Sequence, residues 1–430
     1  MTRHVSYLGF PALPQRDEVI DALIHDPPDI RWRWIRALLR IEDSRELDVF
    51  RDGIQTRMNQ LNASLDWRVV LRLRLALDAI QRPVRVKGYV LVHGKGAFKT
   101  AELEAGGYPP EKADAIPPAV DFFPVVDFHV HPKIPDLKFL SDMHKAGVGH
   151  AVLLATDTDP ANLDRPEIID RIRLQYSRFT HLRKMPLEEV LDVIRSGLYT
   201  QTHVTNRDVA DWVSTYPEKL IGFGSVDPCK SKEYVQEKLS EIESFKFKGI
   251  KLLPYSQFFN PAENENLTLL FDYCRRTGSM VLSHTGCAAG AFELPELSEY
   301  SHPELWKPLA TRYPDVPIVL AHFGSYSTLK PGIWFQEALT LMTACPNVYS
   351  DISAADYLLE DIGKVNQIRK ADCFKQVLFA TDYPGPLYHG ISTQRIVEGI
   401  NLNALLSESE KRMIFGGNAR KLLGIDHPAE

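Results

Sequence analysis

The sequence lacks the features that mark secreted, membrane-bound and nucleic-acid-binding proteins. Its five cysteines are widely spaced, odd in number and without a CxxC pair, which argues against a disulfide framework or a thiolate zinc site and indicates a reducing compartment. No stretch approaches the roughly 18 consecutive apolar residues of a membrane span, and the N-terminus has no continuous apolar segment typical of a secretory signal. The net charge of −6 comes from interspersed signs, whereas nucleic acid requires a concentrated basic surface. We therefore predict a cytoplasmic protein with neither nucleic acid nor membrane as a partner.

The chain changes character near residue 120. Its 430 residues allow two or three domains, or one large barrel with an appendage. Upstream, segments 29–43 and 66–82 carry apolar residues at three- and four-residue spacing, which predicts amphipathic helices, and the run 86–94 favours a strand. We therefore predict a mainly helical N-terminal extension over residues 1–120 and a second domain over residues 121–430.

Downstream, eight short β-branched runs alternate with longer helical patterns. Apolar runs joined by helical crossovers predict a parallel sheet covered by helices. Eight is the strand count of a (β/α)8 TIM barrel, whereas an open doubly wound sheet needs fewer strands and usually a glycine-rich first turn, which is absent here. The expected α/β fold is therefore the barrel. The runs are VVDFHVH (125–131), HAVLLATD (150–157), LIGFGSVD (220–227), GIKLLP (249–254), SMVLSHTG (279–286), PIVLAHFG (317–324), NVYSDIS (347–353) and QVLFATDYP (376–384).

Polar side chains follow the apolar portion of every run. Because the carboxyl ends of barrel strands together form the mouth where the active site lies, these scattered positions are expected to converge in space. The positions are His129 with His131, Asp157, Asp227, Lys251, His284, His322, Asp351 with Ser353, and Asp382.

The pair His129 and His131 is the most informative of these signals. Side chains two apart on a strand point to the same side, so both imidazoles can share one cation. Alone, such a pair is more often two ordinary strand-end histidines. Here, however, four of the fourteen histidines lie at the ends of three runs, with carboxylates at four other ends. Three nitrogen ligands and one carboxylate, leaving an open position, are the pattern of a catalytic zinc-type site.

The strand-end motifs resemble those of the amidohydrolase superfamily of metal-dependent (β/α)8 barrels. The resemblance is closest to the amidohydrolase-2 branch, which includes aminocarboxymuconate-semialdehyde decarboxylase and related decarboxylases and hydrolases. It covers about residues 123–426 and does not extend to the helical N-terminus. It implies a metal-dependent enzyme with a small-molecule substrate, and a homo-oligomer is compatible with it. The motifs are DFHVHP, GFGSVDP, KGIKLLP, VLSHTG, VLAHFGS, LFATDYP and FGGNARKLLGI.

The resemblance implies a role for each matching position. His322 matches a sixth-strand histidine that lies beside the metal-bound water in one-metal members and binds the second ion in two-metal members. The implied ligands of the first ion are His129, His131, His284 and Asp382. The remaining strand-end carboxylates are expected to be hydrogen-bond acceptors, helix caps or loop groups, and they are Asp157, Asp227 and Asp351.

The number of metal ions depends on Lys251. In two-metal members a carboxylated lysine at the end of the fourth strand bridges the ions, but a free ammonium has no lone pair with which to bind metal. The GxK pattern also occurs in one-metal members of the branch. We therefore expect one divalent ion, zinc, with a second ion held by Lys251 and His322 as the alternative.

Three functions are open to a chain with these residues. The first is a hydrolase, in which metal-activated water attacks an amide, ester or lactone and Asp382 or His322 takes the proton. The alternative is a non-oxidative decarboxylase of a hydroxylated aromatic or muconate-type acid, in which the metal holds the substrate and His322 or Asp382 protonates carbon. The third, a non-catalytic barrel whose N-terminus binds a protein, is disfavoured by the complete set of ligand positions.

Overall fold

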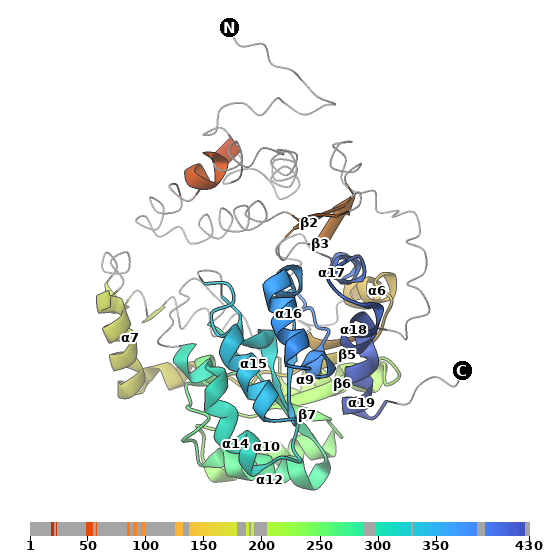
Figure 1. Cartoon of the computed structure of the whole chain (residues 1–430). Coiled ribbons are helices and arrows are strands. Elements are labelled where there is room, and N and C mark those ends of the chain that lie inside the picture. Colours follow the sequence, from red (N-terminus) through yellow and green to blue (C-terminus); the bar gives the residue numbers. More distant parts are fainter. Residues whose placement is uncertain are drawn as a thin grey trace. The chain divides into compact units, whose positions relative to one another are not determined.

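The structure is a computed structural model of the whole chain, and it describes chiefly the region that follows residue 124. The described ranges are 125–131, 137–178, 204–287, 298–327, 330–384 and 392–425, with shorter pieces within 19–57, 84–99 and 186–192 (Figure 1). The chain divides into two compact units, one formed by residues 1–121 with 389–404 and the other by 122–388 with 405–430. The amphipathic helices expected at 29–43 and 66–82 lie outside the described residues.

Eight parallel strands follow one another around the larger unit, and they confirm the predicted TIM barrel. Each strand pairs with the next one in the sequence, from β4 to β11. The circuit is nearly closed, because the main-chain nitrogen of Phe128 donates to the carbonyl of Phe379 at 2.9 Å and that of His131 donates to the carbonyl of Tyr383 at 2.7 Å. The strands are β4 (Val125–Val130), β5 (Val148–Leu154), β6 (Leu220–Ser225), β7 (Gly249–Leu252), β8 (Met280–Ser283), β9 (Ile318–Leu320), β10 (Val348–Asp351) and β11 (Val377–Leu378).

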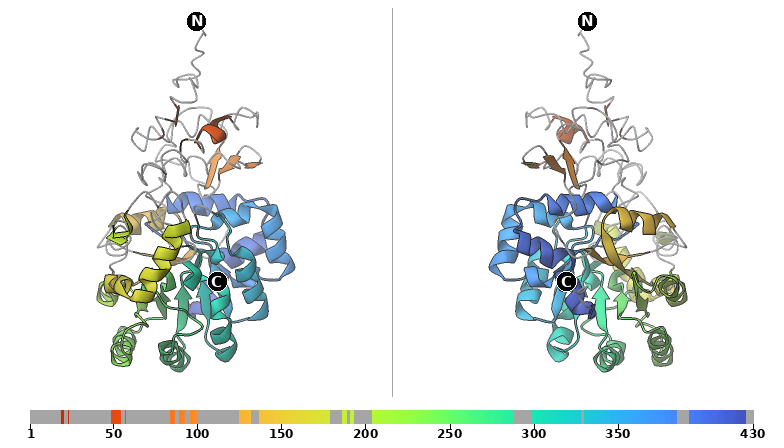
Figure 2. Two further views of the ribbon diagram at one scale, coloured as in Figure 1. Left: turned by 90° about the vertical axis from the view of Figure 1, so that its left-hand side faces the viewer. Right: turned by 90° about the vertical axis from the view of Figure 1, so that its right-hand side faces the viewer.

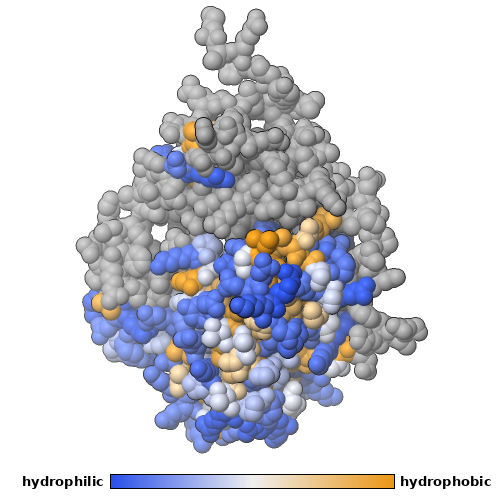
Figure 3. Space-filling view, viewed as in Figure 1, coloured by the Kyte–Doolittle hydropathy of each residue, from blue (hydrophilic) through white to orange (hydrophobic). Residues whose placement is uncertain are grey.

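Helices connect the strands and form the outer layer of the barrel (Figure 2). Their outer surface over α10, α12 and α14 is predominantly hydrophilic, as expected for a solvent-facing layer (Figure 3). None of the helices among the described residues is long and apolar enough to cross a bilayer. The described helices of this unit are α6 (Leu137–Lys145), α7 (Pro166–Arg178), α9 (Asn206–Thr215), α10 (Lys232–Ser244), α11 (Pro254–Gln257), α12 (Asn266–Thr277), α14 (Lys307–Arg312), α15 (Phe335–Ala344), α16 (Ile362–Lys370), α18 (Glu408–Arg412) and α19 (Asn418–Leu423).

Several of these helices begin at side-chain caps that the local sequence supplies. Thr205 and Ser407 form capping boxes at the starts of α9 and α18, and Ser231 accepts a hydrogen bond from the main-chain nitrogen of Tyr234 at the start of α10. Such caps satisfy main-chain donors that have no partner within the helix. Helix boundaries are therefore determined largely by nearby residues.

The smaller unit contains an antiparallel sheet and helix α17 (Thr393–Asn401). The strands are β1 (Val84–Val86), β2 (Tyr89–Val92) and β3 (Gly96–Lys99), paired in that order. The strand predicted within 86–94 corresponds to β2. Helix α17 lies against β3, so this unit combines segments that are about 300 positions apart in the chain.

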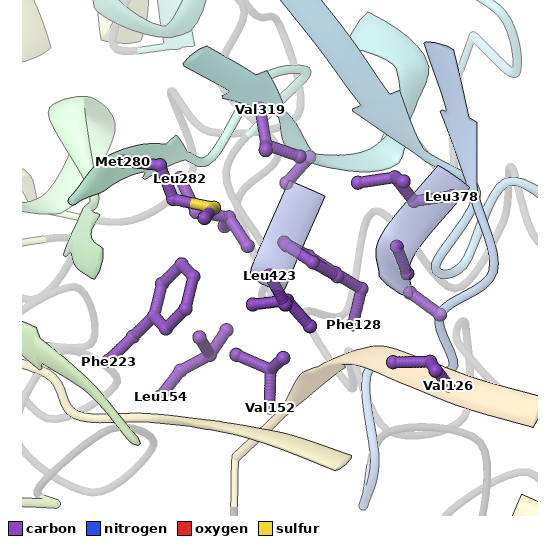
Figure 4. Close-up of a cluster of buried hydrophobic side chains, with 13 residues drawn as sticks. Val126, Phe128, Val152, Leu154, Phe223, Met280, Leu282, Val319, Leu378 and Leu423 are labelled. Carbon is purple, nitrogen blue, oxygen red and sulfur yellow. The ribbon is translucent and has the colours of Figure 1, made fainter. Parts of the chain in front are cut away.

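Apolar side chains fill the centre of the ring of strands (Figure 4). The rings of Phe128 and Phe223 meet edge to face with their centroids 5.8 Å apart. Gly249 has no Cβ, and the ring of Phe223 occupies the space that a Cβ there would need. From the C-terminal helix, Ala419 and Leu423 join the same cluster. This packed interior is a rigid platform for the polar groups at the strand ends.

A buried carboxylate reinforces the seam between β4 and β11. Asp127 accepts hydrogen bonds from the main-chain nitrogen of Thr381 at 3.0 Å and from its hydroxyl at 2.7 Å. It also accepts from the main-chain nitrogen of His129 at 3.3 Å. Burial raises the pKa of Asp127 to about 7 despite these hydrogen bonds. This side chain thus adds to the main-chain hydrogen bonds that join the first and last strands of the barrel.

We expect Phe223→Ala to destabilise the barrel by about 3–5 kcal/mol, since it removes a large fully buried ring and leaves a cavity. The matched control is Ile362→Ala, because Ile362 is 62% exposed and its loss is expected to change stability by no more than about 0.5 kcal/mol. Urea denaturation followed by circular dichroism measures both. Equal midpoints for the two variants would contradict the assignment of Phe223 to the core.

The buried carboxyl group of Asp127 predicts that the stability of the wild type and that of Asp127→Asn depend differently on pH. With its pKa raised to about 7, the folded protein holds a proton on Asp127 that the unfolded chain has lost above pH 4. The contribution of Asp127 to the free energy of unfolding therefore falls as pH rises from 5 to 7, whereas asparagine contributes no such slope. Urea midpoints of both proteins, measured across this range with a chelator present, test the sign. Parallel curves would contradict it.

Candidate metal centre

The two histidines of DFHVHP face one point at the end of β4. Their Nε2 atoms are 3.1 Å apart, as expected if both imidazoles share a cation. Asp382, which follows β11, places its Oδ1 atom 3.5 Å from Nε2 of His129 and 3.8 Å from Nε2 of His131. The main-chain nitrogen of Asp382 donates to the carbonyl of His129 at 2.9 Å, so the seam of the barrel itself brings the carboxylate to the histidines.

The spacing of these three atoms suits a divalent cation. Metal–nitrogen and metal–oxygen bonds of about 2.0–2.2 Å at angles between 90° and 109° place neighbouring ligand atoms about 3.0–3.5 Å apart. The observed separations are close to this range, and the three groups lie near enough to hold one ion. Burial also lowers the pKa of His129 and of His131 well below the ordinary value, which keeps both imidazoles neutral, as metal binding requires.

Lys251 enters the same group from β7. Its Nζ atom lies 3.1 Å from Nε2 of His129, and its side chain is fully buried. Burial lowers the pKa of Lys251 to about 8, while burial raises the pKa of Asp382 to about 7. The lysine therefore donates to the nitrogen lone pair that a cation at His129 would use, and the two compete for it.

His284 and His322 form a second pair beside this group. Nδ1 of His284 lies 3.2 Å from Nε2 of His322. The other nitrogen of His284 is 2.9 Å from the carbonyl of Cys287, and burial lowers the pKa of His284 to about 3. Among the described residues, the three-residue groups able to hold an ion contain His129, His131 and Asp382, or His129, His322 and Asp351, but not His284. The ligand role of His284 thus stays a prediction.

The other predicted strand-end carboxylates have separate surroundings. Asp157 accepts from the hydroxyl of Tyr234 at 2.9 Å and from the main-chain nitrogen of Asp227 at 2.7 Å. Asp227 accepts from the side chain of Asn162 at 2.6 Å, and burial raises its pKa to about 6. Both carboxylates therefore tie loops together beyond β5 and β6, whereas Asp351 contacts His129 directly.

Two aromatic residues beside the histidine pair were missed from the sequence. Tyr255, on α11, is buried with its ring 4.5 Å from that of His284. Tyr326 lies 4.7 Å from the ring of His322 and 5.5 Å from that of His284. Each follows the end of a barrel strand by a few residues, which is the only signal the sequence carries for them.

Comparison with known proteins bears on the family of this chain. A family model described as amidohydrolase matches residues 126–425. A 2-amino-3-carboxymuconate-6-semialdehyde decarboxylase from Dictyostelium discoideum is 25% identical over 243 residues, which are 51% of this chain and 66% of that protein, just under two thirds of its length.

Two solved structures are similar to this chain. A TIM-barrel protein from Bordetella bronchiseptica superposes with a TM-score of 0.50 and 19% identity, covering 70% of this chain and 98% of its own. A 2,6-dihydroxybenzoate decarboxylase from Rhizobium has a TM-score of 0.47 and 13% identity, covering 70% of this chain and 99% of its own. Since the family model covers most of the chain, and the fold and strand-end motifs agree with it, the chain belongs to the amidohydrolase family, in its amidohydrolase-2 branch.

Proposed function

We propose that this chain is a metal-dependent decarboxylase that releases carbon dioxide, without oxidation, from a hydroxylated aromatic or muconate-type carboxylic acid. The observation that carries the proposal is the convergence of His129, His131 and Asp382 on one point beside the His284–His322 pair. Hydrolysis was the first expectation from sequence. The curated relative, which is named a decarboxylase, favours the alternative.

The proposed cofactor is one zinc ion per chain, held by His129, His131 and Asp382 with His284 as the fourth ligand. Such an ion would bind the substrate carboxylate or a neighbouring hydroxyl and withdraw electron density from it. Zinc accepts nitrogen and oxygen ligands, although an imidazole and carboxylate set also suits other divalent ions. Lys251 would have to move away from Nε2 of His129, and its ammonium would then be available to an anionic substrate.

The remaining step is a proton transfer, for which His322 is well placed. Decarboxylation breaks the carbon–carbon bond to the carboxyl group, leaves the electron pair on the ring or alkene carbon and replaces carbon dioxide with a proton. Nδ1 of His322 lies 2.8 Å from the carbonyl of Ser353, so Nδ1 carries one hydrogen, and the proton given to carbon would be a second one that Nε2 takes up from solvent. We assign this role to His322 rather than Asp382, because Asp382 would be engaged by the ion.

Hydrolysis of an amide, ester or lactone is the second candidate. The specific observation in its favour is that Asp382 lies within 3.8 Å of both histidines, where it could take a proton from a metal-bound water. The two reactions use the same ligands and differ in product, so product analysis separates them.

We expect His129→Ala and His131→Ala each to lower zinc content at least tenfold from about one ion per chain, since each removes one of the converging nitrogens. The control is His144→Ala, because His144 is an exposed residue of α6 away from the site. Elemental analysis of protein dialysed against limiting zinc measures the ratio. Unchanged zinc in both site variants would contradict the proposed ligands.

We expect the zinc-loaded protein to release carbon dioxide from one or more members of a panel of hydroxybenzoates and carboxymuconate semialdehydes. His322→Asn is expected to lower kcat by about 10²–10⁴-fold with zinc content unchanged, because it removes the group that exchanges the proton. Carbon dioxide detection and elemental analysis give the two readouts. Turnover of esters or lactones without carbon dioxide release would favour the hydrolase instead.

A further inference from the structure

Asp351, at the end of β10, lies at the centre of a buried hydrogen-bond network behind the metal centre. Its Oδ1 atom accepts from the main-chain nitrogen of His322 at 2.9 Å, from that of Ser353 at 3.0 Å and from the Ser353 hydroxyl at 2.6 Å. Its Oδ2 atom lies 3.0 Å from Nδ1 of His129. Asp351 and Ser353 are both completely buried, so water does not compete for these bonds.

The network determines which nitrogen of His129 carries the hydrogen. A carboxylate only accepts, so Nδ1 of His129 must donate to Asp351. The Ser353 hydroxyl donates its one hydrogen to Asp351. Its oxygen can therefore only accept from Nδ1 of His129, 3.1 Å away. In a neutral imidazole the other nitrogen is then without hydrogen. Nε2, the atom that faces His131 and Asp382, therefore carries the lone pair, to which Lys251 donates when no ion is bound.

The same carboxylate also holds the backbone of His322. That residue has φ of 63°, in the left-handed region that residues other than glycine rarely adopt. The hydrogen bond from its main-chain nitrogen to Asp351 stabilises this conformation. The carbonyl and hydroxyl of Ser353, 2.8 and 2.9 Å from Nδ1 of His322, orient the ring. One carboxylate thus acts on both a candidate metal ligand and the candidate proton donor.

We propose that Asp351 is a positioning residue that holds His129 in the metal-binding tautomer and sets the orientation of His322. The inference rests on the metal site of the proposed function but not on the reaction that the site performs. Carboxylates that accept from the distal nitrogen of a ligand histidine raise its basicity and fix its ring, and their loss typically weakens metal binding 10- to 100-fold.

The decisive variant is Asp351→Asn. Three donors converge on the Oδ1 position, so the amide oxygen of asparagine is expected to stay there and its NH₂ group to face Nδ1 of His129. Because NH₂ only donates, Nδ1 must then accept, and the hydrogen moves to Nε2. Nε2 could no longer bind the ion. We expect the zinc dissociation constant, measured by competition with a chelating dye, to rise about 10- to 100-fold.

Ser353→Ala is the matched control within the same buried network. It removes the hydroxyl, but the main-chain nitrogen and carbonyl of residue 353 remain, as does the bond between Asp351 and His129. The tautomer of His129 should therefore be preserved, and zinc affinity should stay within about threefold of the wild type, well short of the loss expected when a supporting carboxylate is removed. Thermal melting and circular dichroism of both variants report whether the barrel is intact.

If Asp351→Asn does not fold, the tautomer of His129 can be measured in the wild type to test the proposal. Nitrogen-15 shifts of histidine-labelled, metal-free protein should show Nδ1–H on His129, and Nε2–H would overturn the proposal.

A folded Asp351→Asn with wild-type zinc affinity would also overturn it and leave the proposed function standing. Two ions per chain would overturn it as well, by making Asp351 a ligand together with His129 and His322. A wild type that binds no metal would overturn this proposal and the proposed function together.

Discussion

The seam between β4 and β11 is the contact on which the candidate site depends. Asp127 accepts from both the main chain and the hydroxyl of Thr381, and the main-chain nitrogen of Asp382 donates to the carbonyl of His129. These bonds bring the first and last strand ends of the barrel to adjacent positions, and with them the two histidines and the carboxylate that converge on one point. Without this closure the three groups would lie at opposite edges of an open sheet, and no ion could bind them together.

Burial gives this site its electrostatic character. A low-dielectric interior disfavours charge, so the pKa values of the histidines fall and those of Asp127 and Asp382 rise to about 7. Buried carboxyl groups that remain protonated in an apolar setting can ionise and bind metal when a cation supplies the compensating charge. Lys251, whose pKa is lowered to about 8 by burial, supplies positive charge near the carboxylate of Asp382. A metal ion held by His129, His131 and Asp382 would supply positive charge where the ammonium of Lys251 supplies it otherwise.

The polar groups around the site form a connected structure rather than a set of independent ligands. Asp351 joins β10 to His129 on β4 and to the left-handed turn at His322, and Ser353 lies between the two imidazole rings. Tyr255 and Tyr326 border the His284–His322 pair with aromatic rings. A substrate with a flat, conjugated carbon frame is compatible with such surroundings, because offset aromatic contacts favour planar partners. The hydroxylated aromatic and muconate-type acids of the proposed reaction have such a frame.

The sequence by itself determined the features that depend on nearby residues. The two-residue spacing of His129 and His131, the eight apolar runs and the helix caps at Thr205 and Ser231 act over a few positions, and each is seen in the structure. Tertiary structure alone decided which distant groups meet. Asp351 contacts His129, which lies 222 positions earlier in the sequence. The similar strand-end carboxylates Asp157 and Asp227 accept hydrogen bonds from groups in the loops instead. Strand periodicity reveals the side on which a residue lies, but the twist and closure of the barrel select its partner.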